Sequence, residues 1–331
     1  MNSLRILILV DGNHRIGMGH VYRSLHLANE LKKYKHDTVF LTNTLPAKRI
    51  LSRQFKCLSL PKLQSRKNKI FSKFHPDIII LDKLKESTNN LKIYSKNCSN
   101  IVGIDYTGSN KRLIQYGINM LYQKSGIINN NSFSGFEFAI LNKIFTKKKP
   151  IHIKKKINSV IVLQGGSDTE CFTPKIINAL NSLEDNFEIT VVLGPAFNCW
   201  KKLKKAINEN KKRLKIYHNV KNMQRLMSKQ DMAITGGGLT LLELCRLGIP
   251  SLIVCGAPFE NETASMLQRK KFGINLGYGG KLSERKISAA TKRLLADYYK
   301  RKRMNKIGTS LIDGKGVERV SFIINKIGME K

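Results

Sequence analysis

The sequence predicts an α/β protein made of two doubly wound domains that face a cleft. Short continuous apolar runs alternate with segments of helical period along the 331 residues, a length that suits about two domains. A charged stretch around Pro150 interrupts this alternation near the middle, and the pattern then restarts. Glycine-rich turns follow several predicted strands, at the ends where such sheets bind their ligands.

The first half of the chain begins with a buried strand. Residues 4–10 form a run of seven residues, apolar except for Arg5, that is too short to cross a bilayer, and no signal-peptide cleavage site follows it. A helix is predicted over residues 20–33, where apolar side chains recur on one face. Further strands are predicted over residues 38–42, 77–81 and 101–104, which are largely apolar, as buried parallel strands are.

A charged, proline-bearing linker over residues 147–156 separates the two halves, so that the domains cover residues 1–150 and 151–331. The second half repeats the alternation of strands and helices. Its last helix is amphipathic and able to pack back on the first domain. Strands are predicted over residues 159–163, 188–193, 214–217, 232–234 and 251–254, and helices over residues 174–183, 223–229, 240–247, 262–272 and 316–327.

The charge of the chain is strongly unbalanced, since 59 Lys and Arg residues against 23 Asp and Glu give a formal net charge of +36. The surplus indicates a polyanionic partner, either nucleic acid or an anionic membrane face, or it reflects a composition rich in Lys, Ile and Asn. An aromatic content of 8%, without aromatic residues interleaved among basic ones, disfavours nucleic acid. We expect a cytoplasmic protein, with peripheral contact to the inner membrane face as an open alternative.

The chain has six cysteines, and no two of them have the CxxC spacing of a zinc or redox site. Several lie in apolar stretches. We therefore expect all six to be reduced thiols, as is usual in the cytosol, and we expect no zinc. They are Cys57, Cys98, Cys171, Cys199, Cys245 and Cys255.

A first glycine-rich turn lies between the strand at residues 4–10 and the predicted helix. Gly17 and Gly19 allow the backbone to turn tightly and to approach a ligand. His20 stands at the start of the helix, where the dipole opposes protonation and favours a neutral imidazole that can act as a base. Tyr22 replaces the third glycine of a dinucleotide fingerprint. His20 is a candidate catalytic base, unless the turn is purely structural.

A second turn, with Gly165, Gly166 and Ser167, follows the strand at residues 159–163. Its backbone N–H groups could surround an anion, and the Ser167 hydroxyl adds a donor. No Gly-Lys-Ser/Thr sequence follows, so this is not a P-loop. A plain turn is the alternative interpretation.

The third turn is the strongest candidate for a phosphate site. Gly236, Gly237 and Gly238 separate an apolar strand from a helix, so that several N–H groups and the helix dipole meet at one place. Glu243 follows one turn later among apolar neighbours, where a carboxylate needs a polar pocket. It is suited to accept hydrogen bonds from a ribose diol, although a lone Glu on a helix is more often solvated.

Four segments carry a resemblance to a known family, and they read GMGHVYRSLHLANEL, GGSDTECFTPKIINAL, HNVKNMQRLM and ITGGGLTLLELCRLGIPSLIVCGAPFENE. In this order they resemble the SpsG/PseG group of the GT-B superfamily. That group includes spore-coat polysaccharide proteins and the UDP-sugar hydrolase of pseudaminic acid synthesis, and MurG is a more distant relative. The resemblance spans residues 6–320 and implies the GT-B fold, with two Rossmann-like domains.

The resemblance also implies roles for individual residues. The backbone of Val220 would contact the uracil, Glu243 would hold the ribose, and His20 would be the catalytic histidine. The nucleotide diphosphate would contact Gly166, Ser167, Gly237, Gly238, Leu239 and Thr240. The donor sugar would contact Gly17, Gly19, Asn261 and Glu262.

This sequence departs from the family pattern at two places. Glu262 stands where relatives usually carry an amide, which leaves the donor sugar open. The hydrolase uses a tyrosine that follows a strand-end Asp-His pair, whereas this chain has Leu81-Asp82-Lys83-Leu84 there. The second departure favours a transferase over the hydrolase.

The sequence therefore predicts an inverting, metal-independent glycosyltransferase that uses a UDP-sugar in surface polysaccharide or glycan biosynthesis. The acceptor would be a sugar or a lipid-linked sugar, deprotonated by His20, and no cofactor is expected. One alternative is the UDP-2,4-diacetamido-2,4,6-trideoxy-β-L-altropyranose hydrolase of the pseudaminic acid pathway, with water as acceptor. Two more candidate functions are a sugar-nucleotide epimerase, which needs further carboxylates, and a basic nucleic-acid-binding protein.

Overall fold

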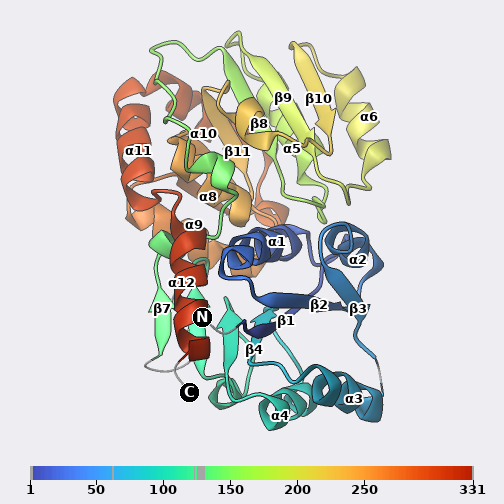
Figure 1. The fold of residues 1–331 in the computed structure, drawn as a ribbon. Helices are drawn as coiled ribbons and strands as arrows, with labels where there is room; N and C mark the ends of the chain where they lie inside the picture. The colour runs from blue at the N-terminus through green and yellow to red at the C-terminus, as the bar shows by residue number, and fades with distance from the viewer. Residues whose placement is uncertain (1–2, 62, 123, 125–130, 330–331) are drawn as a thin grey trace. The chain divides into compact units, whose positions relative to one another are not determined.

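The computed structural model describes residues 3–61, 63–122, 124 and 131–329 (Figure 1). Two compact units divide the chain. Unit 1 comprises Met1–Lys143 and Gly314–Lys331, and unit 2 comprises Ile144–Asp313. The chain passes from unit 1 to unit 2 after Lys143, seven residues before the boundary at residue 150 that the sequence predicted. The last helix of the chain belongs to unit 1.

Unit 1 is built on a parallel sheet whose described strands have the order β3-β2-β1-β4-β5-β6-β7. The chain runs outward from β1 to β3 and then returns to β4 on the other side of β1. The order therefore reverses between β1 and β4, and such switch points are where open α/β sheets bind ligands. The strands are β1 (Arg5–Val10), β2 (Asp37–Thr42), β3 (Lys56–Ser59), β4 (Ile78–Asp82), β5 (Ile101–Ile104), β6 (Tyr116–Asn119) and β7 (Ser132–Ser134).

Helices cover the sheet of unit 1, and the last helix of the chain is one of them (Figure 1). This helix, α12, packs against α1. Gly328 allows a close approach to the start of β1, because a Cβ there would overlap Cδ1 of Leu4. The helices of unit 1 are α1 (Gly19–Leu31), α2 (Leu45–Leu51), α3 (Gln64–Phe74), α4 (Thr88–Asn97) and α12 (Gly316–Met329).

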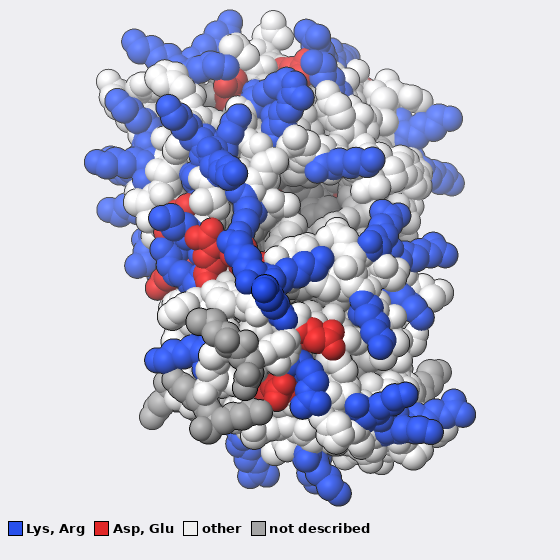
Figure 2. Space-filling model, in the orientation of Figure 1, with Lys and Arg blue, Asp and Glu red and all other residues white. Residues whose placement is uncertain are grey.

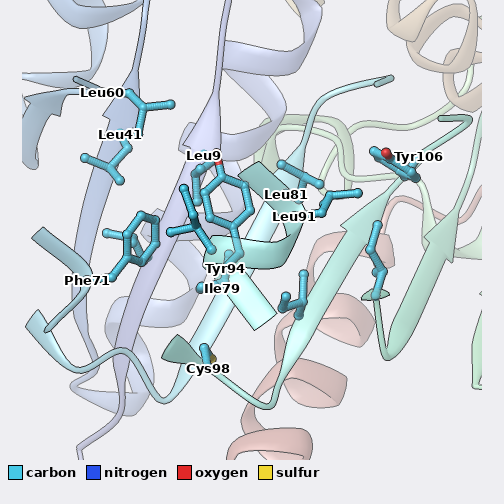
Figure 3. Close-up of a cluster of buried hydrophobic side chains, with 14 of the residues drawn as sticks. Leu9, Leu41, Leu60, Phe71, Ile79, Leu81, Leu91, Tyr94, Cys98 and Tyr106 are labelled. Atoms are coloured by element: carbon cyan, nitrogen blue, oxygen red, sulfur yellow. The ribbon is translucent and has the colours of Figure 1, made fainter. Parts of the chain in front are cut away.

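One core of unit 1 lies between the central strands and the helices α3 and α4 (Figure 3). Alternate residues of each strand enter it, such as Leu7 and Leu9 of β1, because side chains along a strand alternate between the two faces. Phe71 of α3 and Tyr94 of α4 pack together there, with ring centroids 5.2 Å apart. Ile8 is also fully buried, so both faces of β1 are covered, which explains its continuous apolar sequence.

Unit 2 contains a second parallel sheet, whose described strands have the order β10-β9-β8-β11-β12-β13. Its order reverses between β8 and β11, so unit 2 has its switch point there. The strands are β8 (Ser159–Leu163), β9 (Glu188–Leu193), β10 (Leu214–His218), β11 (Met232–Thr235), β12 (Ser251–Cys255) and β13 (Ile274–Tyr278). The helices are α5 (Phe172–Asn181), α6 (Trp200–Asn208), α7 (Met223–Met227), α8 (Leu239–Leu247), α9 (Asn261–Arg269), α10 (Glu284–Ala296) and α11 (Tyr298–Leu311).

The α/β prediction with two parallel sheets is confirmed. Each predicted strand lies within two residues of an observed one, and β5, β8 and β9 have the predicted bounds. The sequence patterns did not predict the edge strands β3, β7 and β13, the strand β6, or the helices α2, α3, α4, α6, α10 and α11. Several of these are short or rich in Lys, so their apolar period is weak.

The prediction of six reduced cysteines was wrong for one pair, because Cys171 and Cys199 form a disulfide. They lie 28 residues apart in sequence, and their α carbons are 5.8 Å apart. Cys171 precedes α5 and Cys199 precedes α6, so the β8-α5-β9 unit brings the two loops together. A search for CxxC spacing cannot detect a pair that a βαβ unit creates. Cys57, Cys98, Cys245 and Cys255 are free.

Lys and Arg side chains are spread over the face shown in Figure 2, with few Asp and Glu among them. The surplus of positive charge is therefore displayed to solvent over many elements. The described helices include none with both the length and the apolar character needed to cross a bilayer.

Candidate nucleotide and catalytic sites

His20 and Asp82 meet at the switch point of unit 1. His20 is the second residue of α1, which follows β1, and Asp82 is the last residue of β4, in register with Val10. Nδ1 of His20 lies 2.6 Å from Oδ1 of Asp82. Because an ionised carboxylate only accepts hydrogen bonds, this contact is a hydrogen bond when Nδ1 carries the ring proton, and Nε2 of a neutral ring then keeps its lone pair. Nη2 of Arg23, which is also a donor, lies 3.0 Å from the same Nδ1. The side chain of His20 is 13% exposed, whereas Asp82 is fully buried.

Arg23 joins Asp82 to a second buried carboxylate. Its Nη2 lies 2.5 Å from Oδ1 of Asp82 and its Nη1 lies 2.5 Å from Oδ2 of Asp105. Burial alone would raise the pKa of Asp82, but the charge of Arg23, that of His20 when its ring is protonated, and the hydrogen bonds of both side chains outweigh it and hold the pKa below its usual range. Ser24 donates a further hydrogen bond to Asp82, at 2.6 Å.

Asp105 follows β5 and has a left-handed backbone, with φ of 50°. Its Oδ1 accepts hydrogen bonds from the backbone N–H groups of Met120, Leu121 and Tyr122, at 2.9, 2.9 and 3.2 Å. The buried group of Arg23, Asp82 and Asp105 thus carries one cation and two anions, and its polar atoms are engaged. Protonation of His20 beside it would make the group neutral.

The turn that precedes His20 depends on glycine at one position. Gly17 has a positive φ of 84°, which L-residues rarely adopt. Its N–H donates to the carbonyl of Asn13, and the Asn13 side chain accepts from the N–H groups of Arg15 and Ile16. Gly17 therefore shapes the turn itself. The contact of Gly17 and Gly19 with a donor sugar stays a prediction.

The glycine turn of unit 2 offers unpartnered hydrogen-bond donors. Gly238 precedes α8 as its N-cap, without a side-chain cap. In the part of the chain that the structure describes, the N–H groups of Gly238, Leu239 and Thr240 donate to no protein atom. The side chain of Gln164 is buried against this turn, with Oε1 3.7 Å from the position of a Cβ on Gly236, and its Nε2 has no partner there either. Such orphaned donors indicate a site that a polar ligand completes.

Gln164 lies at this turn because of strand register. Leu163 of β8 is paired with Thr235 of β11, and the N–H of Gly236 donates to the carbonyl of Leu163. The loops that follow the two strands therefore start side by side at the switch point of unit 2. Gln164 was not among the residues predicted from the sequence, although a polar residue directly after an apolar strand was a usable signal.

Part of the same turn is already occupied by a carboxylate. Oε2 of Glu260 accepts hydrogen bonds from the N–H groups of Gly237 and Gly256, at 2.9 and 2.7 Å. The pKa of Glu260 is raised by burial, which outweighs the opposite effect of these hydrogen bonds. No sequence pattern indicated this contact, which joins the loops after β11 and β12.

Glu243 lies on α8, one turn beyond the glycines, and is half-buried. Burial raises the pKa of its carboxyl group to about 8. Its side chain has no hydrogen-bond partner among the described residues. A carboxyl group in this state is available to a ligand, and the contact of Glu243 with a ribose stays a prediction.

The loop at Gly165, Gly166 and Ser167 is held by the next loop. Gly165 has a positive φ of 70°, and the carbonyl of Gly166 accepts from the N–H of Ala196, at 2.9 Å. A Cβ on Gly194 would overlap the carbonyl oxygen of Gly166, so the two loops are in close contact. Ser167 is buried, and its hydroxyl lies 3.1 Å from that of Thr169.

The remaining predicted residues lie at other loops of unit 2. Val220 follows β10, whose His218 packs on Trp200. Asn261 begins α9 directly after Glu260, and its Oδ1 accepts from the side chain of Asn275, at 2.8 Å. Glu262 lies in the first turn of α9. The structure thus brings Asn261 and Glu262 near the Gly236–Gly238 turn through their neighbour Glu260.

Known families and structures match this architecture. Residues 136–310, just over half of the chain, match the glycosyltransferase family 28 C-terminal domain. The chain is 27% identical to the spore coat polysaccharide biosynthesis protein SpsG of Bacillus subtilis, over 98% of each chain. It is 30% identical to an uncharacterized protein of Methanocaldococcus jannaschii over 78% of its own length, and it spans 56% of that relative.

Solved structures share the fold at low sequence identity. MurG of Acinetobacter baumannii is 12% identical, with a TM-score of 0.70 and coverage of 97% of this chain and 99% of MurG. HepE of Anabaena, in complex with UDP-glucose, is 14% identical with a TM-score of 0.66, covering 98% and 100%. The resemblance read from the four segments is confirmed. The chain belongs to glycosyltransferase family 28, as an SpsG-like protein with the GT-B fold.

Proposed function

We propose that this protein transfers a glycosyl group from a UDP-sugar to an acceptor hydroxyl in surface polysaccharide or glycan biosynthesis, with inversion and without a metal ion. The observation that carries the proposal is the set of unpartnered donors at the glycine turn of unit 2. Three successive N–H groups at the start of α8 and the buried amide of Gln164 would bind the diphosphate.

The same donors would stabilise the leaving group. Negative charge grows on the diphosphate as the glycosidic bond breaks, and prearranged N–H groups and a helix dipole stabilise that charge without reorganisation. Among the described residues, no group of three or more His, Cys, Asp and Glu side chains is arranged to hold a metal ion. In the proposed mechanism, the N–H groups and the helix dipole would serve in place of a cation.

Unit 1 would supply the base. With Nδ1 donating to Asp82, Nε2 of His20 can take the proton of the attacking hydroxyl as the new bond forms at the anomeric carbon. The net negative charge of Arg23, Asp82 and Asp105 stabilises the imidazolium that results. Asp82 also fixes the orientation of the ring, since it is itself held by Arg23 and Ser24.

A UDP-sugar hydrolase is the second candidate, because a His20–Asp82 pair would deprotonate water as well as a sugar hydroxyl. An acceptor-dependence assay separates the two functions. The release of free sugar from UDP-sugar donors is measured with and without candidate sugar or lipid-linked acceptors. Full activity without any acceptor would establish the hydrolase and overturn the transferase.

The nucleotide itself is tested by thermal shift. We expect UDP to raise the melting temperature, since only ligands that bind the folded state do so, and CDP, GDP and NAD to have little effect. Equal shifts with all four nucleotides would contradict a uracil-specific site. No shift with UDP at millimolar concentration would contradict the proposed function as a whole.

The basic surface suggests where the reaction takes place. Many Lys and Arg side chains are exposed to solvent on the face in Figure 2, so an anionic membrane that carries lipid-linked acceptors would attract the protein. We propose peripheral contact with such a membrane as part of this function.

A further inference from the structure

The carboxylate of Glu260 lies where the proposed function places part of the diphosphate. Glu260 ends a short 3-10 turn, Pro258–Glu260, immediately before α9. Its Oε2 accepts from the N–H of Gly237, at 2.9 Å, and from that of Gly256, at 2.7 Å. A carboxylate oxygen that two backbone N–H groups bind at the start of a helix occupies the position of a phosphate oxygen in an anion nest.

The glycines at this place make room for Glu260. A Cβ on Gly237 would lie 2.8 Å from Cβ and 2.8 Å from the carbonyl oxygen of Glu260, so no other residue fits there without a shift. A Cβ on Gly236 would lie 3.4 Å from Oε2, and one on Gly256 would lie 3.6 Å from it. The turn is therefore built around a carboxylate that belongs to the chain itself.

Only N–H groups stabilise this carboxylate. No Lys, Arg or His in the described residues forms an ion pair with it. The charge of Glu260 acts on Cys255 at the end of β12, because it contributes with burial to raising the pKa of that thiol to about 12. A second anion that entered the turn would be repelled by Glu260 unless the side chain moved away.

We propose that Glu260 is an internal competitor for the phosphate-binding N–H groups, bound to Gly237 in the empty protein and displaced from it by the diphosphate. The inference rests on the proposed nucleotide site. The N–H groups of Gly238, Leu239 and Thr240 are free to bind the diphosphate when it first arrives. When Glu260 then releases the N–H of Gly237, that group binds the diphosphate as well. Small anions that lack the uridine contacts would then seldom fill the turn, because they must displace Glu260 with fewer favourable contacts.

The test compares Glu260→Ala and Glu260→Gln with the natural chain. The dissociation constants of inorganic pyrophosphate and UDP are measured by calorimetry at pH 7.5 and low salt. Loss of one competing negative charge should tighten the binding of both ligands by about tenfold in Glu260→Ala. Glu260→Gln, which keeps an acceptor for Gly237 without the charge, should lie between the two. Glu209→Ala removes an exposed carboxylate of the same unit and should change either constant by less than about twofold.

Unchanged or weaker pyrophosphate and UDP binding in both Glu260 variants would overturn the inference, and Glu260 would then only tie two loops together. A crystal structure of the natural chain with UDP gives an answer even if the variants do not fold. Oε2 of Glu260 should have left Gly237, whereas an Oε2 still within hydrogen-bond distance of it beside a bound diphosphate would refute the competition. If the natural chain binds pyrophosphate but not UDP, the proposed nucleotide function fails, and the Glu260 comparison still stands on pyrophosphate.

Discussion

The two units place their candidate sites at equivalent positions but leave them in opposite states. Each site lies at a switch point of a parallel sheet, between β1 and β4 in unit 1 and between β8 and β11 in unit 2. In unit 1 the charged groups of Arg23, Asp82 and Asp105 are mutually paired and fully buried. In unit 2 the three N–H groups of Gly238, Leu239 and Thr240 at the start of α8 and the side-chain Nε2 of Gln164 have no partner among the described residues.

The two sites are therefore organised for a reaction in two different ways. A paired, buried group such as that around Asp82 holds a side chain in one orientation, whether or not a ligand is present. Unpartnered donors are costly in an interior and are tolerated where a ligand completes them. The paired site suits a base that must be positioned, and the unpaired site suits a leaving group that must be bound.

The largest effect is expected from the residue that the paired group positions. His20→Ala should lower turnover about 10²- to 10⁴-fold, the usual contribution of a general base. UDP affinity should stay nearly unchanged, because unit 2 holds the nucleotide. The melting temperature should also change little, since Asp82 keeps Arg23 and Ser24.

Steady-state kinetics, calorimetry and thermal melting of the purified variant measure these three quantities, and His14→Ala in the same turn is the matched control. A folded His20→Ala protein with more than about half of the natural rate would remove His20 from the mechanism. A lower melting temperature with normal turnover per folded molecule would make His20 a structural residue instead.

Removing the shared cation should break the paired group itself. Arg23→Ala leaves two buried carboxylates without their counter-ion, and the free energy of unfolding should fall by about 3–5 kcal/mol. Urea denaturation measures this change, and Arg49→Ala on the exposed face of α2 serves as control, with an expected loss within about 0.5 kcal/mol. Similar stabilities of the two variants would show that the buried group is not strongly coupled.

The unpaired site should respond in ligand binding more than in stability. Glu243→Ala should weaken UDP binding by about 1–3 kcal/mol, because hydroxyl groups of the bound ribose would lose their partner. Calorimetry with UDP measures this loss. An unchanged affinity would reassign the ribose contact to another residue.

The raised pKa of Glu243 also predicts that the stability of the protein depends on pH. Because burial raises the pKa of Glu243 to about 8, the folded state binds its proton more tightly than the unfolded state does. Its contribution to stability is therefore present at low pH and is lost as the pH rises from the usual Glu range through about 8. Urea titrations at pH 5 and pH 8.5 measure the free energy of unfolding. It should fall less between these two pH values in Glu243→Gln than in the natural chain. Parallel pH profiles would contradict the raised pKa.

The smallest effect per residue is expected from the exposed Lys and Arg side chains, which interact with a membrane through solvent, in contrast to the buried charges of unit 1. Each exposed Lys or Arg near an anionic membrane contributes about 1 kcal/mol of attraction. Flotation with vesicles of anionic or neutral lipids should show binding to the anionic vesicles that fades as salt is added. Equal recovery with both kinds of vesicle at low salt would refute the membrane contact.

Much of the fold could be predicted because buried parallel strands have continuous apolar sequences. Strands β1, β4 and β8 are covered on both faces, and their runs were evident without any structure. Edge elements such as β3, with its half-buried Lys-Cys-Leu-Ser sequence, carry no such signal. Helix α3 is rich in Lys and buries only Phe71 completely, so its period was too weak to detect.

By itself, the sequence determined the two α/β halves, the glycine-rich turns, and the candidates His20 and Glu243, because backbone geometry and apolar period act over short stretches of chain. Only the tertiary structure decided the partners. Asp82 meets His20 from 62 residues away, Asp105 meets Arg23 from 82 residues away, and Glu260 reaches Gly237 across a 23-residue interval. Those pairings, like the disulfide between Cys171 and Cys199, follow from strand order and register, which bring chain ends of parallel strands together and which no local pattern encodes.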